Sequence, residues 1–235
     1  MLTGPDGPES LDSCPMIITI DGPAGSGKST AARKLAQALG IAYLDTGATY
    51  RAVTLAAMRR AVDLADETAL AAVARSINLQ LIPKAAGLVV LLDGLDVSRE
   101  IRSAEVSEQS RYAAASPKVR IVLVEMQRRL GQELGSFVTE GRDQGSVVFP
   151  DADFKFYLDA APAVRARRRL EELQTADPAA DYEKVLAAIV ERDRRDRSRP
   201  VAPLLKPDDA IEVDTSDFEI EQTTQRLLEY VERRR

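Results

Sequence analysis

Short apolar runs of strand length alternate with longer segments of helical periodicity along most of this chain. Five runs are rich in β-branched or aromatic residues and are expected to form buried strands, at residues 16–20, 41–45, 136–140, 154–158 and 210–214. Helices are expected at residues 31–39, 46–62, 63–76, 118–133, from about 162, from about 181, and at 218–235. This alternation predicts an α/β fold, a doubly wound five-stranded parallel sheet with helices on both faces.

The pattern changes at residues 77–97, which look like an antiparallel unit rather than another βαβ repeat. Residues 77–82 alternate, residues 88–92 are rich in β-formers, and residues 95–97 can supply a third strand. Asp93 and Gly94 form a hairpin-turn signal, and residues 98–116 are polar and helical. We therefore expect a small antiparallel β-rich insert, whose role is either purely structural or that of a movable substrate-binding flap.

The first predicted strand runs directly into a phosphate-binding loop. Residues 22–29 fit the pattern G-x-x-x-x-G-K-[ST] between a strand and a helix. Glycines let the backbone amides turn inward, and together with the helix N-terminus these amides form an anion cradle. Lys28 can reach the β- and γ-phosphates, and Ser29 can ligate Mg²⁺. The full motif in its context favours a nucleoside triphosphate site over a glycine-rich turn without a ligand. The expected donor-binding residues are Gly22, Pro23, Ala24, Gly25, Ser26, Gly27, Lys28, Ser29 and Thr30.

Candidate groups for a second substrate follow two other predicted strands. Thr46, Tyr50 and Arg51 begin the helix after residues 41–45, and Arg142 and Asp143 follow residues 136–140. Because the carboxyl ends of parallel strands line one crevice, both groups are expected beside the phosphate loop. Arg51 is placed to meet a second phosphate and Tyr50 to flank a sugar or base. The competing interpretation is a capped helix with a surface arginine and a core tyrosine, and the neighbouring motif disfavours it.

A charged helix end at residues 191–199 suggests a lid. Helical spacing puts four side chains on one face, Arg192, Arg195, Asp196 and Arg199. This face can be a solvated helix with internal ion pairs, a nucleic-acid patch, or an arginine lid over transferring phosphates. The net charge of −5 disfavours the nucleic-acid patch. The phosphate loop upstream favours the lid.

The whole-chain composition narrows the chemistry further. The 235 residues include no histidine and one cysteine, Cys14, so any catalysis must use carboxylates, arginines, lysines and a bound metal. A lone cysteine excludes an internal disulfide framework and fits a reducing, cytoplasmic location. No apolar run approaches membrane-spanning length. Residues 1–15 are rich in proline and glycine and are expected to form a disordered leader.

Four separate motifs together resemble bacterial cytidylate kinases. They are DGPAGSGKST at 21–30, DTGATYR at 45–51, EGRDQGSVVFP at 140–150 and RDRRDRSR at 192–199. The resemblance covers residues 16–235 and implies a nucleoside monophosphate kinase domain with a CMP-binding insert at 76–113 and a lid at 176–203. It implies Mg²⁺-dependent transfer of the ATP γ-phosphate to CMP or dCMP in pyrimidine metabolism, by a monomer.

The resemblance also implies roles for individual residues. The residues around CMP would be Thr46, Tyr50, Arg51, Ser110, Arg120, Arg142, Asp143, Arg192, Asp196 and Arg199. Our own hypothesis for the mechanism makes Lys28, Arg142, Arg192 and Arg195 the catalytic cations. The chain departs from the family pattern at a base-contacting serine position, where Arg111 stands with Ser110 beside it. Other small-molecule kinases, acting on UMP, AMP or shikimate, and a non-catalytic nucleotide-binding regulator remain alternatives.

Overall fold

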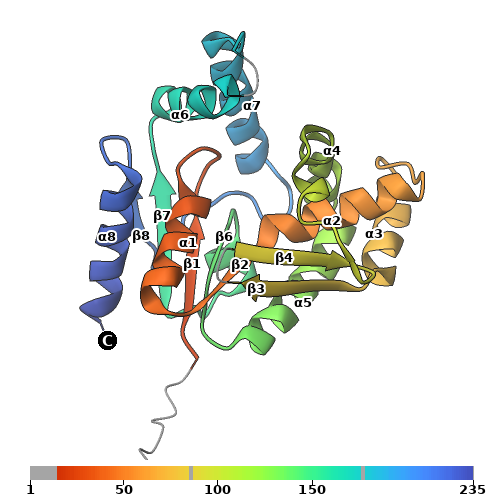
Figure 1. The fold of residues 1–235 in the computed structure, drawn as a ribbon, viewed down its shortest axis with the longest axis horizontal. Coiled ribbons are helices and arrows are strands. Elements are labelled where there is room, and N and C mark those ends of the chain that lie inside the picture. Colours follow the sequence, from red (N-terminus) through yellow and green to blue (C-terminus); the bar gives the residue numbers. More distant parts are fainter. Residues whose placement is uncertain (1–14, 85–86, 176–177, 235) are drawn as a thin grey trace, which may run out of the picture.

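A computed structural model describes residues 15–84, 87–175 and 178–234 and contains a five-stranded parallel sheet (Figure 1). The strand order is β2-β6-β1-β7-β8, and every neighbouring pair is parallel. The strands are β1 (Ile17–Asp21), β2 (Ala42–Asp45), β6 (Phe137–Gly141), β7 (Phe154–Asp159) and β8 (Ile211–Asp214). This confirms the predicted sheet, and β1, which leads into the phosphate loop, is its central strand.

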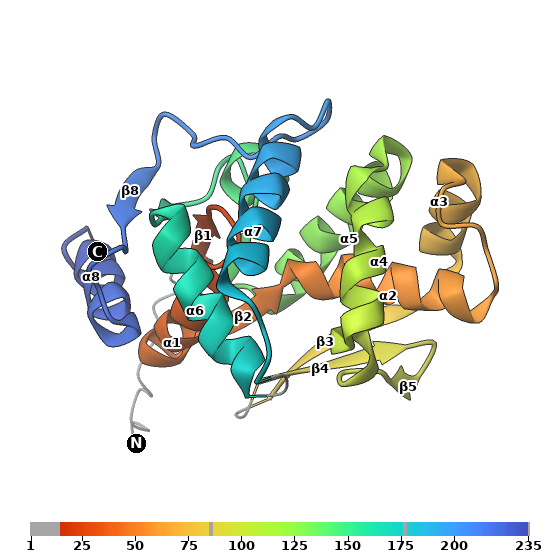
Figure 2. The same cartoon turned by 90° about the horizontal axis from the view of Figure 1, so that it is seen from above.

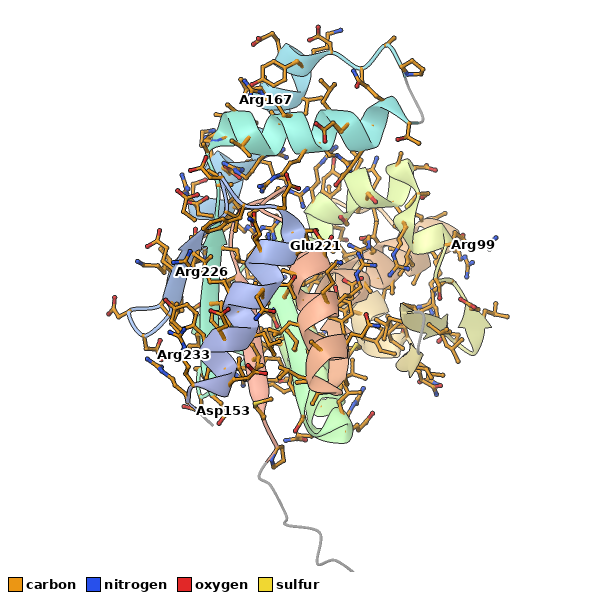
Figure 3. The ribbon with its side chains drawn as sticks, turned by 60° about the vertical axis from the view of Figure 1, so that its left-hand side comes forward. Arg99, Asp153, Arg167, Glu221, Arg226 and Arg233 are labelled. Atoms are coloured by element: carbon orange, nitrogen blue, oxygen red, sulfur yellow. The ribbon has the colours of Figure 1, made fainter. Side chains whose placement is uncertain are left out.

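Helices cover both faces of the sheet, as the alternating pattern predicts. On one face, Ile18 and Ile20 of β1 pack under α1 (Lys28–Leu39) and α8 (Ile220–Glu232). Figure 3 shows Glu221 where α8 meets α1, and its carboxylate pairs with Lys34 at 2.8 Å. The opposite face packs against two further helices, α2 (Thr46–Arg59) and α5 (Pro117–Leu134).

A separate antiparallel sheet lies beside the β2 edge, as expected from residues 77–97 (Figure 1). Its strands are β3 (Leu79–Lys84), β4 (Gly87–Leu92) and β5 (Leu95–Asp96). Asp93 and Gly94 both have positive φ, 51° and 83°, the geometry of a tight hairpin turn. In the chain, this sheet follows α3 (Glu67–Ser76) and precedes a 3₁₀ turn (Glu100–Arg102) and α4 (Ala104–Ala115).

Two packed helices stand over the carboxyl ends of the parallel strands (Figures 1 and 2). They are α6 (Pro162–Gln174), which follows β7, and α7 (Tyr182–Arg197). Seen from above in Figure 2, α6 and α7 lie on the α1 side of the molecule, across from α4 and α5. The pair occupies the position expected of a lid, although residues 176 and 177 lie outside the described residues.

Several predicted helix boundaries were wrong, and in two segments a side-chain cap decides where the helix begins. The helix expected from residue 63 begins at Glu67, since the Asp66 carboxylate accepts hydrogen bonds from two first-turn amides. The segment 98–116 is interrupted at Ser103, which has extended backbone and caps α4. The flanking helices α2 and α8 are shorter than predicted, and α1 begins three residues earlier.

One element was not foreseen from the sequence. After β6 the chain forms a short π-helix, Gln144–Val148, where the sequence suggested only a glycine-flanked loop. The expected leader falls almost wholly on residues 1–14, outside the described residues. Among the described helices, none combines the length and the apolar character needed to cross a membrane.

Candidate active site

The phosphate loop has the backbone conformation that its glycines predict. Gly22, Gly25 and Gly27 have φ values of 148°, 77° and 86°, a backbone conformation that residues with a side chain rarely adopt. A Cβ at Gly22 would lie 2.0 Å from the carbonyl oxygen of Leu158 on the adjacent strand β7. Gly22 is therefore required both by its φ and by the close approach of β7, and the loop is held against the sheet.

Lys28 lies buried inside this loop. Its Nζ donates to the Pro23 carbonyl at 2.6 Å and to the Ser26 hydroxyl at 3.3 Å. Burial, followed by repulsion from Arg142, lowers the pKa of Lys28 to about 7. A phosphate bound in the cradle would supply the missing negative charge and favour the ammonium form, so Lys28 is suited to an anionic ligand.

Glu140, at the end of β6, connects the loop to the neighbouring strands. Its Oε1 accepts a hydrogen bond from Ser29 Oγ at 2.8 Å, and its backbone carbonyl accepts one from Thr46 Oγ1 at 2.7 Å. The Ser29 hydroxyl and the Glu140 carboxylate are hard oxygen ligands of the kind that Mg²⁺ prefers, and they lie side by side. These two side chains fit the metal expected at Ser29.

Asp21, at the end of β1, connects the phosphate loop with the segments that carry Arg51, Arg142 and Asp143. We call the phosphate loop the donor side and these segments the acceptor side. Its carboxylate accepts from the backbone amides of Gln144 at 2.9 Å and Gly145 at 2.7 Å. These amides lie just after Arg142 and Asp143, so Asp21 fixes the loop that presents both side chains. Burial raises the pKa of Asp21 to about 7, although the two amide hydrogen bonds lower it.

Arg51 is held at the start of α2 by Asp45. The Asp45 carboxylate caps α2 through the Ala48 amide at 2.9 Å, and its Oδ2 pairs with Arg51 at 3.0 Å. Arg102, from the 3₁₀ turn of the insert, reaches the same oxygen at 3.3 Å. The predicted phosphate-binding Arg51 is thus joined by a second arginine that the sequence analysis missed.

A buried ion pair lies deeper on the acceptor side. Arg120 of α5 pairs with Asp143, and both side chains are almost fully buried. The Arg120 guanidinium also stacks over the Tyr50 ring, 5.6 Å from its centroid. Residues predicted from three distant segments therefore come together.

Three buried polar atoms of this region have no hydrogen-bond partner among the described residues. They are Tyr50 Oη, Arg51 Nε and Arg120 Nε. Unpaired buried donors cost free energy, so they are uncommon in native proteins. Three of them around one cluster indicate a site whose polar ligand completes the hydrogen bonding.

The charged end of α7 meets the acceptor side through Asp196. Asp196 is buried and pairs with Arg142 at 2.8 Å and with Arg199. Attraction to Arg142 and Arg199 outweighs burial and lowers the pKa of Asp196. Arg192 keeps an exposed surface on α7, and desolvation by the surrounding protein, followed by repulsion from Arg142, lowers its pKa to about 10.

Arg195 does not join this cluster. It is exposed and lies against Glu191, with Nε 3.5 Å from the carboxylate. A role for Arg195 in the lid remains a prediction, and its guanidinium lies against Glu191 rather than against Asp196. Helical spacing shows which residues share a face, but it does not show where that face points.

Comparison with known proteins identifies the family. The family model described as cytidylate kinase matches residues 18–233. This chain belongs to the cytidylate kinase family. Curated family members include cytidylate kinase 1 of Haemophilus influenzae, 44% identical over 93% of this chain and 94% of its own length. Another is the cytidylate kinase of Serratia proteamaculans, 44% identical over 91% of this chain and 93% of its own. The crystal structure of an uncharacterized protein from Eubacterium ventriosum covers 92% of this chain and 98% of its own, with a TM-score of 0.51 and 14% identity, which shows a shared fold.

Within this cytidylate kinase fold, the two residues considered for the missing base-contacting serine are engaged elsewhere. Ser110 Oγ donates to the Ser107 carbonyl at 2.8 Å, one turn back in α4. Arg111 pairs with Glu108 at 3.0 Å and lies over the Tyr112 ring. A base contact from Ser110 remains a prediction, whereas Arg120 and Asp143 already lie together in the buried part of the site.

Three residues that sequence reasoning did not select contact the predicted site residues or the segments that carry them: Asp21, Glu140 and Arg102. Asp21 and Glu140 are carboxylates at the ends of the two adjacent strands β1 and β6. A search for acidic residues at predicted strand ends would have found both. Arg102 had no comparable signal, because its position depends on how the insert packs against α2.

Proposed function

We propose that this protein transfers the γ-phosphate of ATP to CMP or dCMP, producing ADP and CDP or dCDP. The observation that carries the proposal is the group of unpaired buried donors around Tyr50, Arg51 and Arg120, opposite a phosphate loop. The loop suits a nucleoside triphosphate, and the opposing cluster suits a second ligand with both a phosphate and a polar base. Membership in the cytidylate kinase family supports CMP as that ligand.

On the donor side, the loop amides and Lys28 hold the ATP phosphates. Ser29 and Glu140 would hold Mg²⁺, which neutralises phosphate charge when it is bound. Lys28 supplies a further positive charge at the β- and γ-phosphates. These groups position the γ-phosphorus and stabilise the charge that develops during transfer.

On the acceptor side, Arg51 and Arg142 bind the CMP phosphate and direct one of its oxygens at the γ-phosphorus. A phosphate dianion is already nucleophilic, so no histidine base is needed. That oxygen forms the new bond to the γ-phosphorus while the bond to the leaving ADP oxygen breaks. Asp143 can accept from the cytosine amino group, and Arg120 can donate to its carbonyl or ring nitrogen. Uracil presents the reversed donor pattern, which this pair would reject.

The α6–α7 pair acts as the lid in this proposal. Arg192 neutralises the transferring phosphoryl group, and Asp196 with Arg199 joins the lid to the nucleotide. Closure excludes water and so limits ATP hydrolysis. We further propose that the insert (76–113) binds CMP and that the lid spans 176–203. We also propose that the enzyme acts as a cytoplasmic monomer on small nucleotides, without nucleic-acid or membrane partners.

A coupled assay of ADP release tests the function. CMP or dCMP should stimulate ADP release far more than UMP or AMP, and the stimulation should require Mg²⁺. Lys28→Ala should remove most of kcat because the transition state loses a charge at the transferred group. Intact ATP binding without stimulation by any monophosphate would support a non-catalytic regulator instead, and preference for AMP or shikimate would support a different kinase.

A further inference from the structure

The proposed mechanism leaves one buried arginine beneath the phosphate loop without a role. Arg165, in the first turn of α6, is 1% exposed. Its Nε donates to the Ala160 carbonyl at 2.7 Å, and its Nη1 donates to the Ala24 carbonyl at 3.1 Å. A Cβ at Gly25 would lie 3.2 Å from the Arg165 Cβ. Arg165 thus supports the loop directly from behind.

The remaining nitrogen of Arg165 reaches the lid helix. Nη2 lies 2.7 Å from Oδ2 of Asp193 on α7, and both side chains are buried. The other carboxylate oxygen, Oδ1, has no hydrogen-bond partner among the described residues. One guanidinium therefore contacts the strand end, the phosphate loop and the lid at the same time.

Asp193 is placed to determine how α7 is rotated about its own axis. It follows Arg192 directly and precedes Asp196 by three residues. Successive residues of an α-helix differ by about 100° around its axis, so Asp196 lies about 60° from Asp193. With Asp193 fixed toward the loop, Asp196 faces Arg142, as the 2.8 Å pair shows. Arg192 lies about 100° from Asp193 on the same side as Asp196, so Arg192 and Asp196 are only about 40° apart on the helix.

Stability alone does not explain this pair. Desolvation makes buried ion pairs poor stabilisers, and apolar residues of similar size often serve as well or better. An ion pair with arginine adds a fixed orientation, because the guanidinium donates its hydrogen bonds only in its own plane. The Arg165 contacts connect the two parts that must be aligned for phosphoryl transfer.

We propose that Arg165 and Asp193 are positioning residues that couple the phosphate loop to the lid. Arg165 holds the loop at Ala24 and, through Asp193, orients α7 so that Arg192 and Asp196 face the transferring phosphate. This inference rests on the proposed kinase function. Without the coupling, ATP still binds, but the lid arginine is misdirected and water enters during the reaction.

Asp193→Asn tests the coupling with little change in side-chain shape. The assay measures ADP and CDP separately at saturating ATP and CMP, together with KM for ATP and thermal unfolding. We expect kcat to fall about tenfold or more, since small misplacements of catalytic groups cost up to about 10²-fold. KM for ATP should change less, and the ADP formed should exceed the CDP formed. Asp193→Glu, which keeps the charge, should recover part of the CDP yield.

A second variant separates positioning from stability. The double substitution Arg165→Met with Asp193→Leu removes both charges and fills the same space, so it leaves no unpaired buried charge. We expect this double variant to fold and to show the same low kcat and the same excess of ADP over CDP as Asp193→Asn. Glu172→Gln, which disrupts an exposed ion pair with Arg169 on α6, is the matched control and should leave both unchanged.

The outcomes separate the inference from the proposed function. Wild-type kcat and equal ADP and CDP yields in either Asp193→Asn or the folded double variant would overturn the inference, even if thermal stability changed. A wild-type enzyme without CMP-stimulated ADP release would refute the proposed function and the inference together. An active wild type whose variants release excess ADP would support both.

Discussion

Replacing Asp143 with asparagine is expected to weaken both the fold and CMP recognition, because the substitution leaves a buried guanidinium without its anion. The side chains of Arg120 and Asp143 are only 4% and 5% exposed. Arg120 Nε already has no partner among the described residues, and Nη1 has only a long contact of 3.5 Å to the Ala114 carbonyl. The carboxylate is therefore the main partner of that charge.

The size of the effect follows from this burial. Removing one member of a buried ion pair costs about 3–5 kcal/mol. For a chain of this length each kcal/mol lowers Tm by about 2–4 °C, so Tm should fall by about 6–20 °C. Losing a charged hydrogen-bonding group costs about 1.5–3 kcal/mol in binding, which corresponds to a rise of about 10- to 100-fold in KM for CMP. KM for ATP should change less, because the contact that is lost is with Arg120 and not with the phosphate loop.

Thermal unfolding and steady-state kinetics of Asp143→Asn test these values. Glu108→Gln is the matched control, because its ion pair with Arg111 is exposed and its loss should cost less than about 1 kcal/mol. Adding CMP should raise Tm of the wild type more than Tm of Asp143→Asn. An Asp143→Asn variant with unchanged Tm and unchanged KM for CMP would refute the reasoning that this pair is both buried and part of the nucleotide site.

Three other expectations follow from the described contacts. Arg192→Ala should lower kcat by up to about 10³-fold, because Arg192 is close enough to Arg142 and Asp196 to interact with their charges. Arg195→Ala should lower it less than about threefold in the same assay, because the Arg195 guanidinium lies against Glu191. Gly22→Ala should be clearly less stable in urea than Gly40→Ala, because both have positive φ but only Gly22 faces a close backbone oxygen. Burial raises the pKa of Asp21 to about 7, so the folded state retains a proton that the unfolded state releases near pH ~4. Stability should fall as pH rises between these values, and urea titrations of Asp21→Asn across this range should show a smaller fall.

The sheet could be predicted from the sequence because its signals are local. Each parallel strand is a short apolar run, and the phosphate-loop motif predicts both the strand before it and the helix after it. The Asp93–Gly94 turn likewise determines the hairpin of the insert by its own backbone preference. Helix starts were less accurate, because a cap such as Asp66 can compete with several acidic neighbours for the same role.

The site could be predicted only where a side chain's role follows from its own segment. Lys28 and Ser29 belong to a motif, whereas the contacts of Asp21 are with amides more than 120 residues away. Arg165 and Asp193 were not selected from the sequence, although both lie in charged stretches of predicted helices. Their burial depends on how α6 packs against α7 and the phosphate loop, and the helical periodicity of the sequence does not show this packing.

In the proposed acceptor site, carboxylates of the protein already orient the arginines that would bind the CMP phosphate. Arg51 pairs with Asp45, and Arg142 and Arg199 share Asp196. Each cation is therefore oriented before a nucleotide arrives, so little side-chain entropy is lost on binding. A phosphate must compete with these carboxylates for the same donors, which disfavours weakly charged anions. A nucleotide that also supplies partners for Tyr50 Oη and Arg120 Nε gains hydrogen bonds for which no group among the described residues competes. Discrimination among monophosphates should therefore depend on the base and less on the phosphate.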